Sequence, residues 1–263
     1  MDVTTSVDGT RLAYERSGEG PALVLVLGAL NDRHSGAPLA AALTPRFTVL
    51  TYDRRGRGDS GDTPPYAPER EIEDLDALIR AVGGSAFVYG HSSGAALALE
   101  AALAGLPITK LALYEPPYIV DASRPPQADD YLSRLQALVA AARRADTVEL
   151  FWREGLGLPT EAVTGMRAAP WFPSLEALAR TIPYDIAILG DHMRGRPLPA
   201  EWATRVTIPT LVIDGAESSA QLRNAVAALA ELLPQAERRT LEGQGHGAPP
   251  EVLVPVLEPF FLG

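Results

Sequence analysis

One short stretch, Gly-His-Ser-Ser-Gly at residues 90–94, constrains this chain more than any other feature. It directly follows the apolar run 86–89, and an alanine- and leucine-rich run of helical character begins right after it. The pattern G-x-S-x-G between a strand and a helix is typical of a nucleophile elbow, a sharp turn that holds its serine at strained backbone angles. A side chain larger than hydrogen at Gly90 or Gly94 would clash with that turn. A glycine-rich turn can also contain a serine by chance, but the flanking strand and helix favour the elbow, with the hydroxyl of Ser92 pointing out of a sheet.

Composition indicates a globular chain. Its 263 residues are 46% hydrophobic and 21% charged, enough for one large core or for a core with a small appended domain. No run approaches the roughly 18 apolar residues of a membrane span. The net charge of -10 opposes binding to nucleic acid or to an anionic membrane. Without a basic, apolar leader and without cysteine, a cytoplasmic protein is expected.

The order of apolar runs predicts the fold class. Strand-like runs alternate with helical ones, and this spacing is typical of an α/β fold with a doubly wound, mostly parallel sheet. Chemistry-bearing loops then lie at the carboxyl ends of the strands. The expected strands are 3–6, 11–16, 22–27, 47–52, 86–89, 108–114, 210–215 and 238–241. Outside the middle segment, helices are expected at 38–43, 69–82, 220–233 and 251–261, together with the run that directly follows the elbow, including 95–99.

Between residues 117 and 207 this alternation stops. Helices are expected at 131–144, 147–154, 160–166 and 174–182, separated by proline and glycine. The many large apolar side chains here are either the ordinary core of a helical layer or the walls of a small-molecule pocket. We favour a helical cap, or lid, inserted into a core domain formed by 1–116 and 208–263.

The turn after the expected strand 47–52 is rich in arginine. Arg54, Arg55 and Arg57 are expected either to lie in solvent or to pair with nearby carboxylates such as Asp53 and Asp59, rather than to form a phosphate site.

Taken together, these features resemble the α/β-hydrolase superfamily over essentially the whole chain. The marks are the apolar strand ending at Gly28, the turn 53–60, the elbow at Ser92, the insertion in the middle, and a histidine, His246, just before the final helix. The resemblance implies the α/β-hydrolase fold, but it says little about the substrate, because this fold hosts many reactions.

A serine hydroxyl needs a base that removes its proton, and histidine has a suitable pKa. Four histidines are present: His34, His91, His192 and His246. His246 occupies the position where the superfamily keeps its catalytic base, so we assign that role to His246.

The histidine of a serine hydrolase is oriented by a third residue, an acid, and two positions are candidates for it here. Most relatives carry an aspartate shortly after the strand that here ends at Gly215, but this chain has Ser218 at the expected position. Some members of the superfamily, certain haloalkane dehalogenases among them, place the acid after the strand that follows the elbow helix. That position is Glu115 here, and we favour it, with Glu217 as the alternative.

The resemblance also implies an oxyanion hole made by the backbone N–H groups of Ala29 and Ser93. Residues near these positions, or in the expected cap, are candidates for contact with substrate. They are Leu30, Asn31, His91, Tyr118, Trp152 and Trp171.

The leading functional hypothesis is a serine hydrolase that needs no cofactor and acts on an ester, lactone or thioester of a small, largely apolar substrate. Ser92 excludes relatives with an aspartate nucleophile. The alternatives are C–C hydrolase, lyase, haloperoxidase-like or cyclase chemistry at the same site, and a non-catalytic ligand-binding homologue. No metal or nucleotide motif is present, and the oligomeric state, including a homodimer, is left open.

Overall fold

The computed structural model describes all 263 residues and is built around one eight-stranded sheet. The strand order is β1-β2-β4-β3-β5-β6-β7-β8. The strands are β1 (Asp2–Thr5), β2 (Arg11–Ser17), β3 (Ala22–Val26), β4 (Thr48–Tyr52), β5 (Ala86–His91), β6 (Ile108–Tyr114), β7 (Thr210–Gly215) and β8 (Ala236–Leu241).

Neighbouring strands from β4 to β8 in this order pair in parallel, and β2 is antiparallel to both β1 and β4. The central strands β3 and β4 are almost wholly buried, as their continuous apolar sequences require of strands covered on both faces. The predicted α/β class with a doubly wound, mostly parallel sheet is confirmed.

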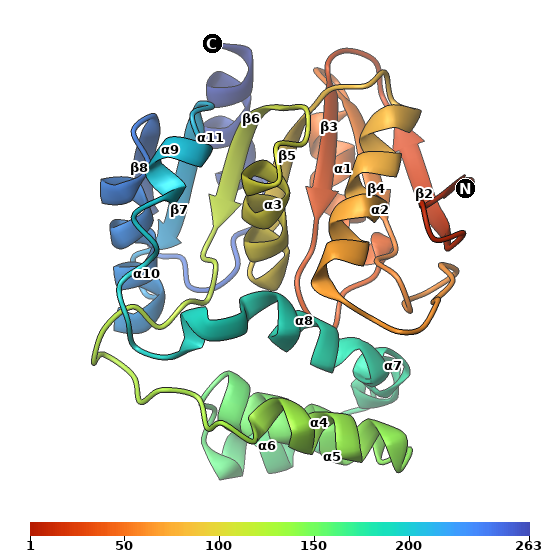
Figure 1. Ribbon diagram of the computed structural model, residues 1–263, viewed down its shortest axis with the longest axis vertical. Helices are drawn as coiled ribbons and strands as arrows, with labels where there is room; N and C mark the ends of the chain where they lie inside the picture. Colours follow the sequence, from red (N-terminus) through yellow and green to blue (C-terminus); the bar gives the residue numbers. More distant parts are fainter.

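Helices cover both faces of the sheet (Figure 1). On one face, α1 (Ala37–Leu43) and α11 (Pro250–Leu262) pack over the smaller of two hydrophobic clusters. On the other face, α2 (Pro68–Ala81), α3 (Ser93–Leu103) and α10 (Ala220–Leu232) contribute to the larger cluster. No helix combines the length and the apolar character needed to cross a bilayer.

A set of helices separates β6 from β7 and contributes to the same larger cluster. In Figure 1 the helices of this set from α4 to α8 lie across the carboxyl ends of the parallel strands, with α8 next to the sheet, whereas α9 lies beside β7. The division into a core and a cap at 117 and 207 stays a prediction. The set consists of α4 (Tyr131–Ala140), α5 (Arg144–Leu150), the π-helix η2 (Phe151–Gly155), α6 (Thr160–Arg167), α7 (Phe172–Leu178), η3 (Ala179–Thr181), α8 (Ile182–Leu189), η4 (Gly190–Met193) and α9 (Trp202–Arg205).

One expectation about these helices is wrong. A single helix was expected over 174–182, but α7 ends at Leu178 and a further helix, α8, begins at Ile182. Pro183 lies in the first turn of α8, where a missing backbone N–H is tolerated, so this proline starts a helix instead of ending one.

The elbow glycine beside β3 gives a first prediction. A Cβ at Gly94 would lie 2.7 Å from the carbonyl carbon of Leu27 and closer still to the carbonyl oxygen of Val26, and backbone cannot move away cheaply. We expect Gly94→Ala to lower the free energy of unfolding by about 3 kcal/mol or more. The matched control is Gly165→Ala in α6, where no atom lies within 4 Å of the new Cβ and alanine should stabilise the helix by up to about 1 kcal/mol. Urea unfolding of both variants checks this, and equal stabilities would contradict it.

Candidate active site

Ser92 lies alone between β5 and α3, in the turn that the sequence predicts. Its φ of 57° and ψ of -127° are unusual for a residue other than glycine. The backbone N–H of Ser92 donates to the carbonyl of Tyr114 at 2.9 Å, which ties the turn to β6. Gly28, after β3, packs directly on it, since a Cβ there would lie 2.9 Å from the Cβ of Ser92. The turn is therefore fixed from two neighbouring strands.

His246 lies in the loop between β8 and α11, and its Nε2 is 3.0 Å from the Oγ of Ser92. Two side chains hold this loop. The hydroxyl of Tyr114 donates to the carbonyl of Gly245 at 2.5 Å, and the Nε2 of His91 donates to the carbonyl of His246 at 2.7 Å. The His246 side chain keeps 34% of its surface exposed, so it is open to an incoming molecule.

Glu115 follows β6 immediately and is completely buried. Its Oε2 lies 2.7 Å from the Nδ1 of His246, and its Oε1 accepts the backbone N–H of Gly215 at 2.8 Å. Glu217 is exposed, and its side chain makes no hydrogen bond to His246. Of the two carboxylates that the sequence leaves open, the structure brings Glu115 to the histidine.

These contacts determine the tautomer of His246. A carboxylate only accepts hydrogen bonds, so the proton between His246 and Glu115 belongs to Nδ1 of the ring. In the neutral ring Nε2 is then an unprotonated acceptor directed at the hydroxyl of Ser92. Ser92 is thus arranged to give up its proton to His246.

His91 has the opposite arrangement. Because its Nε2 faces a carbonyl, that nitrogen carries the proton. Burial and the nearby His246 lower the pKa of His91 to about 4, and the hydrogen bond to the His246 carbonyl only partly offsets this. At neutral pH His91 is therefore an uncharged donor that holds the His246 backbone.

The loop after β3 carries the other predicted groups. No protein atom accepts a hydrogen bond from the backbone N–H of Ala29 or of Ser93, the first residue of α3. Leu30 has a φ of 59°, and the Nδ2 of Asn31 donates to the carbonyl of Ala29 at 2.8 Å. Leu30 also lines a hollow of about 460 Å³ together with Leu178 of α7.

The remaining substrate candidates lie among the helices between β6 and β7 or just before them. Tyr118 is completely buried and Trp152 is 4% exposed, whereas Trp171 is 48% exposed. The rings of Trp152 and Trp171 meet edge to face at 6.1 Å. Contact of any of them with substrate stays a prediction.

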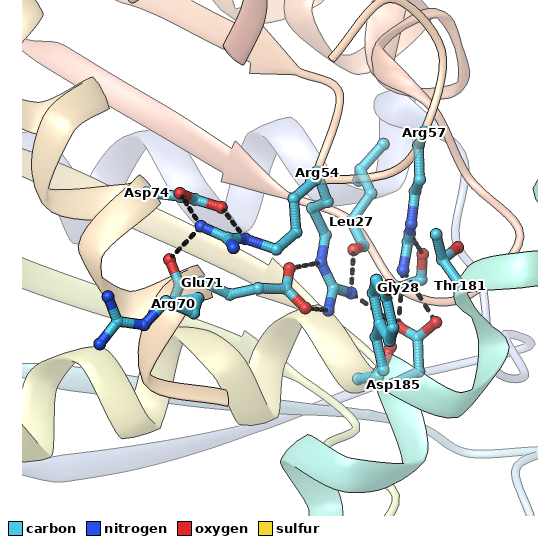
Figure 2. Close-up of polar contacts among 12 residues, drawn as sticks. Leu27, Gly28, Arg54, Arg57, Arg70, Glu71, Asp74, Thr181 and Asp185 are labelled. Carbon is cyan, nitrogen blue, oxygen red and sulfur yellow. Dashed lines mark hydrogen bonds and ion pairs between the residues drawn. The ribbon is translucent and has the colours of Figure 1, made fainter. Parts of the chain in front are cut away.

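The arginine-rich turn after β4 is buried and paired with carboxylates, so of the two alternatives the solvated loop is wrong. Arg54, Arg55 and Arg57 are each at most 2% exposed. Their partners are not Asp53 and Asp59, which both pair with Arg33. Figure 2 shows that Arg54 pairs with Glu71 and that Asp185 pairs with both Arg54 and Arg57. Arg55 pairs with Asp74.

Within this cluster the positive and negative charges are equal in number, since the three arginines face three buried carboxylates. Burial alone would raise the pKa of Asp185, but Arg57 and Arg54 outweigh it and hold that pKa below its ordinary value. For Asp74 burial prevails over the hydrogen bond from Arg55, and its pKa is raised.

Asp185 is the residue of this region that sequence reasoning missed. The available signal was the arginine turn itself, because three guanidinium groups beside an apolar strand need carboxylate partners if they are buried. The sequence does not say which carboxylates these are, since Asp185 lies 131 positions after Arg54.

No three His, Asp or Glu side chains come together in a way that could hold a metal ion. The expectation that the protein uses no cofactor stays a prediction.

Comparison with known proteins identifies the family. The sequence profile of the alpha/beta hydrolase family matches residues 23–255. The chain belongs to this family. An alpha/beta hydrolase from Sphaerobacter thermophilus DSM 20745, known from a crystal structure, is 55% identical in sequence. The two structures match with a TM-score of 0.93, and the match covers 99% of this chain and 100% of that chain.

Two curated hydrolases match shorter parts of this hydrolase. N-formylmaleamate deformylase from Pseudomonas putida is 35% identical over 117 residues, 43% of this chain and 44% of that protein. The uncharacterized hydrolase YraK from Bacillus subtilis is 34% identical over 101 residues, 37% of each chain. Both matches span less than half of the curated relative.

The lowered pKa of His91 gives a prediction about stability. The unfolded chain protonates this histidine near its ordinary pKa of 6.5, and the folded protein only near 4. Between these values the unfolded state binds more protons, so acidification in this window destabilises the fold. We expect the melting temperature of His91→Asn to fall less between pH 6.5 and pH 4 than that of the wild type. Replacement of exposed His34 by Asn is the control, and a His91 variant with the wild-type pH dependence would contradict the assignment.

Proposed function

We propose that this protein is a serine hydrolase that needs no cofactor and forms an acyl-enzyme on Ser92. The observation that carries the proposal is the continuous chain from the Ser92 hydroxyl through His246 to Glu115, with distances of 3.0 Å and 2.7 Å. In this reading Ser92 is the nucleophile, His246 the general base, and Glu115 the acid that holds the tautomer and stabilises the imidazolium.

The reaction follows from the proton positions. Nε2 of His246 takes the hydroxyl proton while the oxygen of Ser92 attacks the carbonyl carbon of the substrate. The same nitrogen then gives that proton to the leaving group, and the acyl group stays on Ser92. Water, deprotonated in the same way, attacks the acyl carbon. The bond from this carbon to the oxygen of Ser92 breaks, that oxygen takes the proton back from Nε2 of His246, and the acid is released. Since Glu115 is buried and also accepts the N–H of Gly215, it can keep the ring oriented through both halves.

The charge that develops on the substrate carbonyl oxygen needs donors. The backbone N–H groups of Ala29 and Ser93 are suited to this because no protein acceptor uses them. Ser93 is also the first residue of α3, where the helix presents unpaired N–H groups and a partial positive charge.

We propose a carboxylic ester, lactone or thioester of a small, largely apolar molecule as the substrate. Leu30 supports an apolar ligand, since it follows the proposed oxyanion donor Ala29 and packs against the larger hydrophobic cluster. The net charge of -10 is consistent with a partner that is neither nucleic acid nor membrane.

A second candidate is hydrolysis of a formamide, because one of the relatives is named a deformylase. Its mechanism would use the same groups, with an amine as the leaving group. Assays of 4-nitrophenyl esters beside N-formyl amides separate the two candidates, and faster turnover of the amides would favour the second.

Labelling with a fluorophosphonate probe tests the proposal. We expect intact-mass measurement to show one adduct on the wild type, located at Ser92, and none on Ser92→Ala. Glu115→Gln should label about 10³- to 10⁴-fold more slowly, because the amide no longer supports the imidazolium. Glu217→Gln should label like the wild type, since that side chain is exposed and away from His246. A wild type that is not labelled would refute the proposal. If Glu217→Gln labels slowly and Glu115→Gln labels like the wild type, Glu217 is the acid instead.

A further inference from the structure

Asp185 is a buried acid that the proposed mechanism does not use. It belongs to α8, the helix next to the carboxyl ends of the strands in Figure 1, and is 1% exposed. Its carboxylate accepts four hydrogen bonds, two from Nη2 of Arg57 at 2.8 Å, one from Nη1 of Arg54 at 2.7 Å and one from the hydroxyl of Ser93 at 2.7 Å. Figure 2 shows Asp185 entering the arginine turn from the turquoise helix.

Arg57 connects this carboxylate to the loop after β3. Its Nη1 donates to the carbonyl of Gly28 at 2.6 Å and to the carbonyl of Asn31 at 3.1 Å. The peptide bond between Gly28 and Ala29 is trans, so its C=O and N–H point in opposite directions. A guanidinium that fixes the carbonyl of Gly28 therefore also fixes the direction of the N–H of Ala29.

The charge on Arg57 adds to this effect. A cationic donor polarises the amide whose carbonyl it binds, and hydrogen bonds in a chain strengthen one another. The N–H of Ala29 is thereby a stronger donor than an ordinary peptide N–H. Gly28, the other half of this peptide, packs directly on Ser92.

The second oxyanion donor is reached from the same carboxylate. The hydroxyl of Ser93 donates to Oδ1 of Asp185, and the N–H of Ser93 belongs to the same residue. Asp185 therefore holds Ser93 directly and Ala29 through Arg57. Asp185, which lies 92 positions after Ser93, thus contacts Ser93 itself and contacts Arg57, which binds the peptide of Ala29.

We propose that Asp185 and Arg57 are positioning residues that orient the two oxyanion donors, the N–H groups of Ala29 and Ser93. Acyl transfer then depends on how α8 packs against the sheet. This inference rests on the proposed function and assigns the positioning of its oxyanion donors to residues outside the triad. Buried ion pairs are often no better for stability than apolar side chains of similar size, so a role in geometry accounts for this cluster better than a role in stability.

The chain offers a matched control in Asp74. Asp74 is equally buried, pairs with Arg55 of the same turn, and has no contact with Ser93 or with the loop 27–31. Asp185→Asn and Asp74→Asn each remove one buried negative charge and keep the shape of the side chain. Both variants should melt at a lower temperature than the wild type.

The readout is saturation kinetics of fluorophosphonate labelling at Ser92, which needs no knowledge of the substrate. We expect Asp185→Asn to lower the limiting rate roughly 10- to 100-fold, with little change in the half-saturating probe concentration. Asp74→Asn should keep the wild-type limiting rate. Ser93→Ala keeps the backbone N–H and removes the hydroxyl that donates to Asp185. It should show a smaller loss of limiting rate, and it is measured alongside in case Asp185→Asn fails to fold.

The outcomes separate this inference from the proposed function. If the wild type labels at Ser92 but Asp185→Asn and Ser93→Ala behave like Asp74→Asn, the positioning role is wrong and the serine mechanism stands. If the wild type does not label at Ser92, the proposed function fails, and this inference fails with it. A loss confined to Asp185→Asn and Ser93→Ala supports both.

Discussion

The hydrogen bond between the buried carboxylate of Glu115 and the ring of His246 is the interaction on which the site depends. It joins the end of β6 to a loop 131 positions later, and it leaves Nε2 of the ring free to accept from Ser92. The hydrogen bonds to the Gly245 and His246 carbonyls act on the same loop. Without Glu115, the ring would lose the acceptor that keeps its proton on Nδ1.

Backbone strain gathers at the same edge of the sheet. Leu30 follows β3, Ser92 follows β5 and Glu115 follows β6, and all three have a positive φ without being glycine. Each such residue destabilises a fold by about 1–3 kcal/mol and persists only where its surroundings hold it. Here the surroundings are hydrogen bonds between neighbouring strands and the buried cluster of arginines and carboxylates.

The sequence was sufficient for the parts of the site that depend on local patterns. Ser92 was identifiable because an elbow needs glycine on both sides within a few residues, and the α/β class followed from the alternation of strands and helices. His246 and Glu115 needed the family resemblance, which implied where the chain brings them. Asp185 was not accessible, because a side chain that pairs across 131 positions leaves no periodicity or spacing, and because Pro183 concealed the start of α8.

The tautomers of the histidines test the central claim most directly, and ¹⁵N NMR of protein labelled at histidine measures them without substrate or probe. We predict that at neutral pH His246 is protonated on Nδ1 and His91 on Nε2, and the variants His246→Ala and His91→Asn assign the signals. If His246 instead carries its proton on Nε2, the ring cannot both donate to Glu115 and accept from Ser92, and the catalytic arrangement described above would be wrong.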